Sequence, residues 1–205
     1  MPDRLEQFPL FPLGLVMLPS EVAPLHIFEE RYKLMIRECL DTRGEFGIVW
    51  LADDGLREVG CTARVTQVLD EMDDGRMNIL VEGTSPFRLL RRIEDLPYPA
   101  GDVELLADGD EPGDDGAEAA RERYAELVER VTDDRPDTGD LADLDAYAMA
   151  ATLDFELDAK QDLLELRSEG SRLERLAELF TATLAGIDHA EVAAERSRGN
   201  GRMGH

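Results

Sequence analysis

The segment FPLFPLGLVMLPSEVAPLHIFEERYKLMI, residues 8–36, restricts the possible folds of this chain more than any other stretch. Its first part is apolar, as in a membrane anchor or an export signal, but it contains Pro9, Pro12 and Pro19. A spanning helix needs about 20 apolar residues, and proline removes backbone donors from it. No basic stretch precedes the run, and no small-residue cleavage site follows it. We therefore expect a mature, cytoplasmic chain with no membrane partner.

The charge of the chain excludes one class of partner. With 205 residues, 43% of them hydrophobic, the chain can bury a core, but its formal net charge is -24. Such acidity repels phosphate backbones, so we expect no nucleic-acid partner. Cys39 and Cys61 form no C-x-x-C pair, so we expect two small buried side chains in a reducing compartment.

Hydrophobic periodicity predicts a helix followed by strands. One helical stripe begins at Phe28 and continues to Leu40, with Gly44 placed to end the helix. Runs rich in β-branched and aliphatic residues then predict strands over 46–51, 59–72, 76–83, 86–93 and 102–106. The Asp-Gly pair at 74–75 favours a hairpin turn. Several short strands around one helix indicate a small, closed or nearly closed sheet.

The second half of the sequence predicts helices. Residues 107–119 break every period, and they do not match a calcium loop, because Pro112 and Ala119 stand where oxygen ligands are needed. Beyond them, apolar stripes predict a helical bundle whose last helix opens at a capping box, Ser171 to Glu174. We therefore divide the chain into a β-barrel (1–107), an acidic linker (108–116), a helical bundle (117–190) and a disordered tail (191–205).

The sequence contains no recognisable catalytic or metal motif. It has no G-x-x-x-x-G-K-[ST] phosphate loop, and its three histidines, at 26, 189 and 205, have no metal-ligand spacing. Glu29 and Glu30 are adjacent and point in different directions on a helix. We therefore expect no enzyme, no metal and no cofactor. The one basic cluster, Arg88, Arg91 and Arg92, is interpreted as solvated strand positions paired with acidic neighbours, with anion or RNA binding as the alternative.

The opening segment resembles the start of the amino-terminal, substrate-binding domain of the Lon protease family, which carries a similar LP…PL.IFE.RY pattern. VGCTARV (59–65) and ILVEGTSPFRLL (79–90) are similar to further patterns of that domain, in the same order. DFELDAKQDLLEL and RLERLAEL resemble its helical half, so the resemblance covers roughly residues 6–187.

This resemblance implies an α+β fold, a β-barrel of the pseudouridine-synthase-associated (PUA-like) type followed by a C-terminal helical bundle. A Lon protease continues into an ATPase module and a Ser/Lys peptidase module, and the sequence contains neither. The resemblance therefore implies a stand-alone, non-enzymatic module that binds unfolded or extended polypeptide. Such a module would act as an adaptor or regulator in protein quality control, with a protease or chaperone as its partner.

The candidate contact residues are Leu15, Met17 and Leu18 in the turn after the first proline-rich run. If this turn leaves them exposed, they supply an adaptable apolar surface; otherwise they close the floor of the barrel. Two other functions stay open at this point. The PUA-like barrel is also compatible with an RNA-binding protein, although the charge opposes it, and an enzyme with an unrecognised site is the third alternative.

Overall fold

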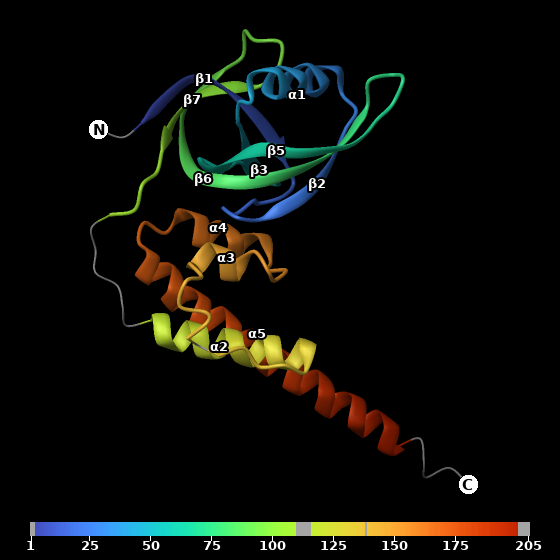
Figure 1. The fold of residues 1–205 in the computed structure, drawn as a ribbon, viewed down its shortest axis with the longest axis vertical. Coiled ribbons are helices and arrows are strands. Elements are labelled where there is room, and N and C mark those ends of the chain that lie inside the picture. Colours follow the sequence, from blue (N-terminus) through green and yellow to red (C-terminus); the bar gives the residue numbers. More distant parts are fainter. Residues whose placement is uncertain (1–2, 110–115, 138, 201–205) are drawn as a thin grey trace. The chain divides into compact units, whose positions relative to one another are not determined.

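The structure, a computed structural model, describes residues 3–109, 116–137 and 139–200. Contacts divide the chain into a barrel unit, Met1–Gly109 with Tyr147–Arg167, and a helical unit, Asp110–Ala146 with Ser168–His205. Strands followed by helices confirm the expected α+β class (Figure 1). Most of the expected linker, 110–115, lies outside the described residues. Within the described residues, no helix combines the length and apolarity needed to cross a bilayer.

Five strands of the barrel unit form a closed ring. Its members are β1 (Arg4–Leu13), β7 (Ala100–Leu105), β6 (Met77–Ile93), β5 (Val59–Glu71) and β3 (Phe46–Ala52). All neighbours in the ring are antiparallel except β1 and β3, whose parallel pairing from Leu10↔Gly47 to Leu13↔Trp50 closes it. Two strands lie beside the ring: β2 (Val22–Ile27) pairs with β6, and β4 (Gly55–Leu56) pairs with β3. The closed sheet expected from the strand pattern is therefore present.

The proline-rich opening segment forms two strands, β1 and β2. Proline is tolerated in β2 because this strand pairs on one side only, with β6, so the missing N–H of Pro24 need not interrupt a second ladder. The two strands expected over 76–83 and 86–93 are one continuous strand, β6, which passes through Pro86. Irregularities in the β5–β6 register accompany this passage.

The core of the barrel unit lies on both sides of β1. Phe8 and Leu10 pack with Val49, Phe87 and Val103 in one buried cluster. Phe11, the next residue along β1, points the other way and packs against Tyr32 of α1 (Glu30–Thr42), with 4.1 Å between ring centroids and a tilt of 33° between the rings. The helix therefore covers the outside of the strand whose other face fills the ring.

Helix α4 (Leu157–Glu165) belongs to the barrel unit by its contacts. The Gln161 side-chain amide donates to the carbonyl oxygen of Val59 at 3.2 Å, and Lys160 Nζ lies 2.6 Å from Glu21 Oε1. Lys160 is almost fully buried, so the Glu21 carboxylate is needed to offset the cost of removing the ammonium charge from water. The sequence-based boundary at 117–190, which assigned this helix to the bundle, remains a prediction. Helix α3 (Ala146–Ala150) spans the junction between the two units.

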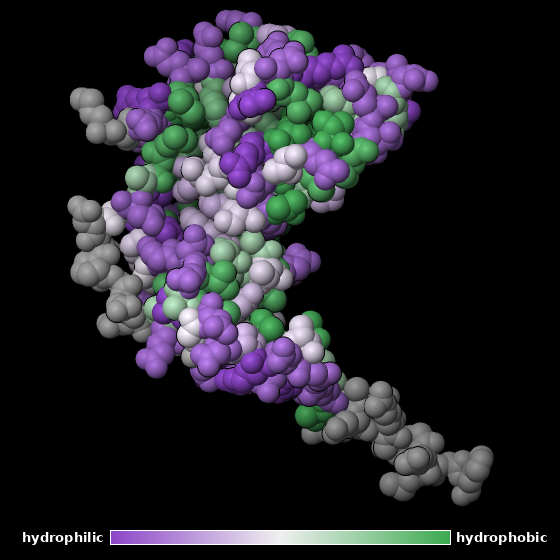
Figure 2. All heavy atoms as spheres, viewed as in Figure 1, coloured by the Kyte–Doolittle hydropathy of each residue, from purple (hydrophilic) through white to green (hydrophobic). Residues whose placement is uncertain are grey.

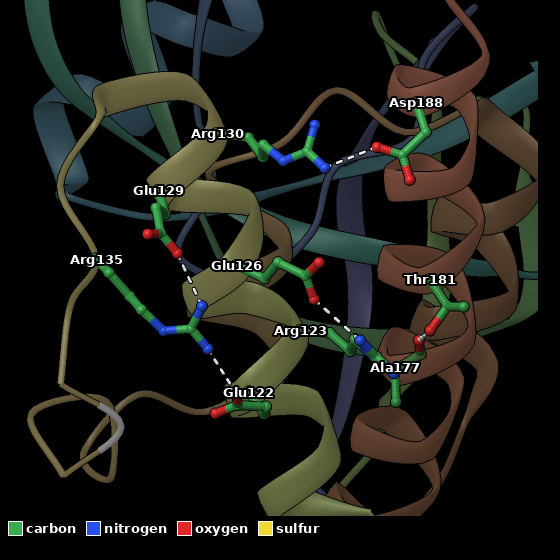
Figure 3. A network of polar contacts seen from close by, with 9 residues as sticks. All are labelled: Glu122, Arg123, Glu126, Glu129, Arg130, Arg135, Ala177, Thr181 and Asp188. Carbon is green, nitrogen blue, oxygen red and sulfur yellow. Dashed lines mark hydrogen bonds and ion pairs between the residues drawn. The ribbon is translucent and has the colours of Figure 1, made fainter. Parts of the chain in front are cut away.

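The helical unit is built on α2 (Ala117–Thr132) and α5 (Glu169–Asn200), which pack through Tyr124 and Phe180. Figure 3 shows the polar contacts around α2, including Arg130 of α2 2.7 Å from Asp188 of α5. Such exposed pairs contribute little stability, because water and salt screen the attraction between the charges.

Helix α5 begins earlier and ends later than the sequence pattern indicates. It starts at Glu169 rather than at Ser171, because the Ser168 hydroxyl accepts the N–H of Ser171 at 3.2 Å and so caps the first turn. It continues to Asn200, so residues 191–200 of the expected tail are helical, and 201–205 lie outside the described residues.

Gly83 fixes the approach of the turn after β1 to strand β6. Its N–H and carbonyl bond to Glu21 and Ser20, each at 2.9 Å, and a β-carbon there would lie 2.1 Å from the Leu18 carbonyl oxygen. We expect Gly83→Ala to lower the free energy of unfolding by about 1–3 kcal/mol, since backbone atoms must move apart. Urea denaturation measures this. Gly14→Ala is the control, because nothing lies within 4 Å of its β-carbon; equal urea midpoints for both variants would contradict the packing described.

Candidate functional site

The structure places the three sequence-predicted contact residues unequally. Met17 and Leu18 are 1% and 0% exposed and belong to the core, whereas Leu15 is half-buried. Of the two alternatives left open by the sequence, burial favours the packing role for Met17 and Leu18. Only Leu15 presents part of its side chain to solvent. Their participation in binding remains a prediction.

Two polar contacts of Glu21 hold this turn in place. Glu21 Oε2 accepts the Leu18 N–H at 2.9 Å, while its other oxygen binds Lys160 of α4. One carboxylate therefore joins the turn to the helix beneath it. A turn held by backbone and ionic contacts on both sides has little freedom to expose Met17 or Leu18.

The substitution Met17→Asp tests whether Met17 packs in the core or contacts a bound polypeptide. Because Met17 is buried, the substitution places an unpaired carboxylate in the core, and we expect a loss of about 3–5 kcal/mol in the free energy of unfolding. The half-buried Leu15→Asp is the charge-matched comparison, with a smaller loss. Chemical denaturation of both variants gives the answer, and an unchanged midpoint for Met17→Asp would show that the turn is not packed as described.

A groove of about 380 Å³ lies in the barrel unit, and we name it the proline groove. Its walls come from the end of β1, from β4, from the first turn of α1 and from the loop between β6 and β7. Its volume is within the range of pockets that accept side chains or small ligands. The apolar lining consists of Leu10, Pro12, Leu56, Ile93, Leu96, Pro97, Tyr98, Pro99 and Ala100, and the charged lining of Arg31, Arg92 and Glu94.

The loop that forms one wall of the proline groove is anchored at two points. The Tyr98 hydroxyl donates to Glu38 of α1 at 2.5 Å, and the Pro99 carbonyl oxygen accepts the N–H of Leu10 at 2.8 Å. Burial, together with the bond to Glu38, raises the pKa of Tyr98 to about 12, so the hydroxyl remains a donor at neutral pH. Three prolines further restrict the backbone around the groove. The groove is therefore largely preformed.

A second groove of about 340 Å³ adjoins the first, since Leu56 and Arg92 line both; we name it the leucine groove. Its other lining residues are Arg57, Glu58, Leu89, Leu90 and Arg91. Arg57 is paired with Asp54 at 3.1 Å and lies over the ring of Trp50, the single tryptophan. Arg91 is paired with Asp102 at 2.7 Å, and the hydrogen bond from its guanidinium holds the pKa of that carboxyl below its usual value.

The lining of these two grooves is suited to binding a ligand through apolar contacts. In the described part of the chain, no three His, Cys, Asp or Glu side chains lie close enough to hold a metal ion. Burial raises the pKa of both thiols, Cys39 and Cys61, so neither is an activated nucleophile. Preformed apolar walls with charged groups at the rim are suited to holding the side chains of an extended chain.

Sequence reasoning did not find these grooves. The residues of the proline groove come from positions between 10 and 100 and meet only when β1 closes the ring, whereas residues 56–58 and 89–92 of the leucine groove meet where the start of β5 pairs with β6. A local signal existed in the run LPYP at 96–99, where apolar and proline residues follow one another without strand or helix periodicity. Figure 2 shows hydrophobic residues at the surface of the part of the molecule that contains the sheet, interrupted by hydrophilic ones.

Comparison with known proteins decides the family. The family model described as "ATP-dependent protease La (LON) substrate-binding domain" matches residues 7–182. The chain belongs to the Lon substrate-binding domain family. Among its relatives, a Lon protease of Paraburkholderia phytofirmans is 24% identical over 221 residues, covering 97% of this chain and 27% of that protein. A Lon protease of Anaeromyxobacter dehalogenans is 26% identical, covering 84% of this chain and 22% of that protein.

Solved structures agree with this assignment. A Lon N-terminal domain protein from Xanthomonas campestris has a TM-score of 0.63 and 26% identity, covering 84% of this chain and 97% of that chain. The N-terminal domain of a Mycobacterium avium complex Lon protease has a TM-score of 0.62 at 19% identity, which supports the fold alone. The chain spans about a quarter of the length of the Lon proteases that it matches, and the matching family model is that of the substrate-binding domain only.

Proposed function

We propose that the chain binds unfolded or extended polypeptide at the proline groove. The observation that carries the proposal is the groove itself, with preformed apolar walls in a domain whose family is described as substrate-binding. Met17 and Leu18 are buried, so the proposal moves the contact surface from this pair to the groove and leaves Leu15 as a candidate at its own position.

The binding mode follows from the lining residues. Leu56, Ile93 and Leu96 offer aliphatic surface, and Tyr98 with its neighbouring prolines offers flat, rigid surface. Rigid walls bind with little loss of side-chain entropy, because few rotamers are immobilised. A side chain of a passing polypeptide gains affinity by removing this apolar area from water.

The proposal assigns no catalytic step to this chain. The groove offers contacts to a polypeptide and no activated nucleophile, and the comparisons reach the substrate-binding part of the Lon proteases. A role as adaptor or regulator in cytoplasmic protein quality control follows as the finer part of the proposal: a module that holds extended segments can present them to a protease or chaperone.

Substitution of one groove residue tests the proposal. Leu96→Asp adds a carboxylate to the proline groove, and we expect about a tenfold or greater loss of affinity for a permanently unfolded test protein, as for an interface residue of intermediate importance. Fluorescence anisotropy of the labelled test protein measures it. Because apolar contact carries the binding, affinity of the parent protein is expected to persist at high salt.

Val131→Asp is the matched control. It introduces the same charge at a side chain that is 75% exposed on α2, outside the groove. We expect it to bind like the parent protein. If Leu96→Asp folds and binds the test protein as tightly as Val131→Asp, the proline groove is not the binding surface.

A further inference from the structure

Arg92 lies where the two grooves meet. It lines both the proline groove and the leucine groove, a position that it shares only with Leu56 among their lining residues. An extended chain that used both grooves would therefore pass over Leu56 and beside the guanidinium of Arg92.

A register shift in the sheet gives Arg92 this position. The β6–β7 register shifts between Leu89 and Arg91, after which Arg91 lies opposite Asp102 and Arg92 opposite Gly101. Residues directly opposite in an antiparallel pair share a face. A β-carbon at Gly101 would point toward Leu10 and Leu89, so Arg92 belongs to the side of the strand on which these apolar residues lie.

Arg92 also differs from the other groove arginines in its partners. Arg31, Arg57 and Arg91 each form an ion pair with a neighbouring carboxylate. Within the residues that the structure describes, the Arg92 side chain has no hydrogen bond and no ion pair. This is notable in a chain with 46 acidic and 22 basic side chains, where carboxylates are abundant.

The acidic lining residues lie to either side of this position. Glu94 lines only the proline groove, and Glu58 lines only the leucine groove. Each groove therefore has one carboxylate in its lining, its other arginines are paired with carboxylates, and the positive charge without a partner among the described residues lies where the grooves join. A ligand complementary to this surface has a negative charge between two apolar groups.

We propose that the combined grooves select extended polypeptide segments in which two apolar side chains flank an acidic residue, with the acidic residue bound by Arg92. The inference rests on the proposed function and specifies the segment that the site takes. One apolar side chain occupies each groove, and the carboxylate accepts hydrogen bonds from the guanidinium, whose planar fork matches a carboxylate.

Blocked eleven-residue peptides test this. Each contains two leucines with three residues between them, and the central residue is Glu, Gln or Lys. Binding is followed by the fluorescence of Trp50, because Arg57 both stacks on Trp50 and lines the leucine groove. We expect the affinity order Glu, Gln, Lys, with the Glu peptide about two- to fivefold tighter than the Gln peptide, as for an exposed ion pair.

Variants of two arginines on the same strand decide the position. Arg92→Gln is expected to remove the difference between the Glu and Gln peptides, while the Gln peptide binds as before. Arg88→Gln is the control, since Arg88 is exposed on β6, has no partner among the described residues and lines neither groove. We expect it to keep the parent affinity order.

Each contrary result has a distinct meaning. Equal binding of all three peptides to the parent protein overturns the acidic preference and leaves polypeptide binding standing. Absence of binding by all three, together with failure of the unfolded test protein, overturns the proposed function as well. Equal effects of Arg88→Gln and Arg92→Gln overturn the assignment to Arg92. A single-stranded RNA that displaces the Glu peptide from the parent protein, but binds Arg92→Gln poorly, overturns the peptide as occupant in favour of nucleic acid.

Discussion

The parallel pairing of β1 with β3 is the constraint on which the rest of the barrel unit depends. It joins the amino-terminal strand to the strand that follows helix α1 and closes the ring that β7, β6 and β5 would otherwise leave open. The same strand supplies Leu10 to the inner cluster, Phe11 to the contact with α1, and Pro12 to the proline groove. Closure, core and groove are therefore three consequences of one strand pairing. Closure also removes sheet edges, which in an open sheet favour aggregation.

Local patterns in the sequence predicted much of the fold. Helix α1, the β5–β6 hairpin and helix α2 follow from periodicity and turn chemistry, because each depends on residues close in the chain. The opening segment was harder, since its prolines hide strand character in β1 and β2. Strand β6 was divided in two at Pro86, because proline normally ends a strand, and only the paired register shows that this one continues. The capping residue of α5 was placed three positions late, since Ser171 and Ser168 offer the same hydroxyl.

The candidate site was less accessible from the sequence. Leu15, Met17 and Leu18 attract attention as apolar residues close together in a turn, yet their exposure depends on Gly83, which lets the turn approach β6 closely enough to bury Met17 and Leu18. The proline groove joins residues far apart in the chain, which no periodicity relates. The arginine cluster was noticed, but the different surroundings of Arg91 and Arg92 come from a register shift between strands. Pairing across strands, rather than pattern along one, decides which side chains are available for binding.

Hydrogen exchange of the backbone, read by mass spectrometry with and without a permanently unfolded polypeptide, tests the central claim most directly. Binding at the grooves reduces exchange where their walls are formed, so protection is expected in peptides that cover residues 54–58 and 90–100. The turn at 14–19, where Met17 and Leu18 are already buried, and helix α2 are expected to exchange at the same rate in both states. Protection confined to the turn or to the helical unit, with no change at residues 90–100, would contradict the account.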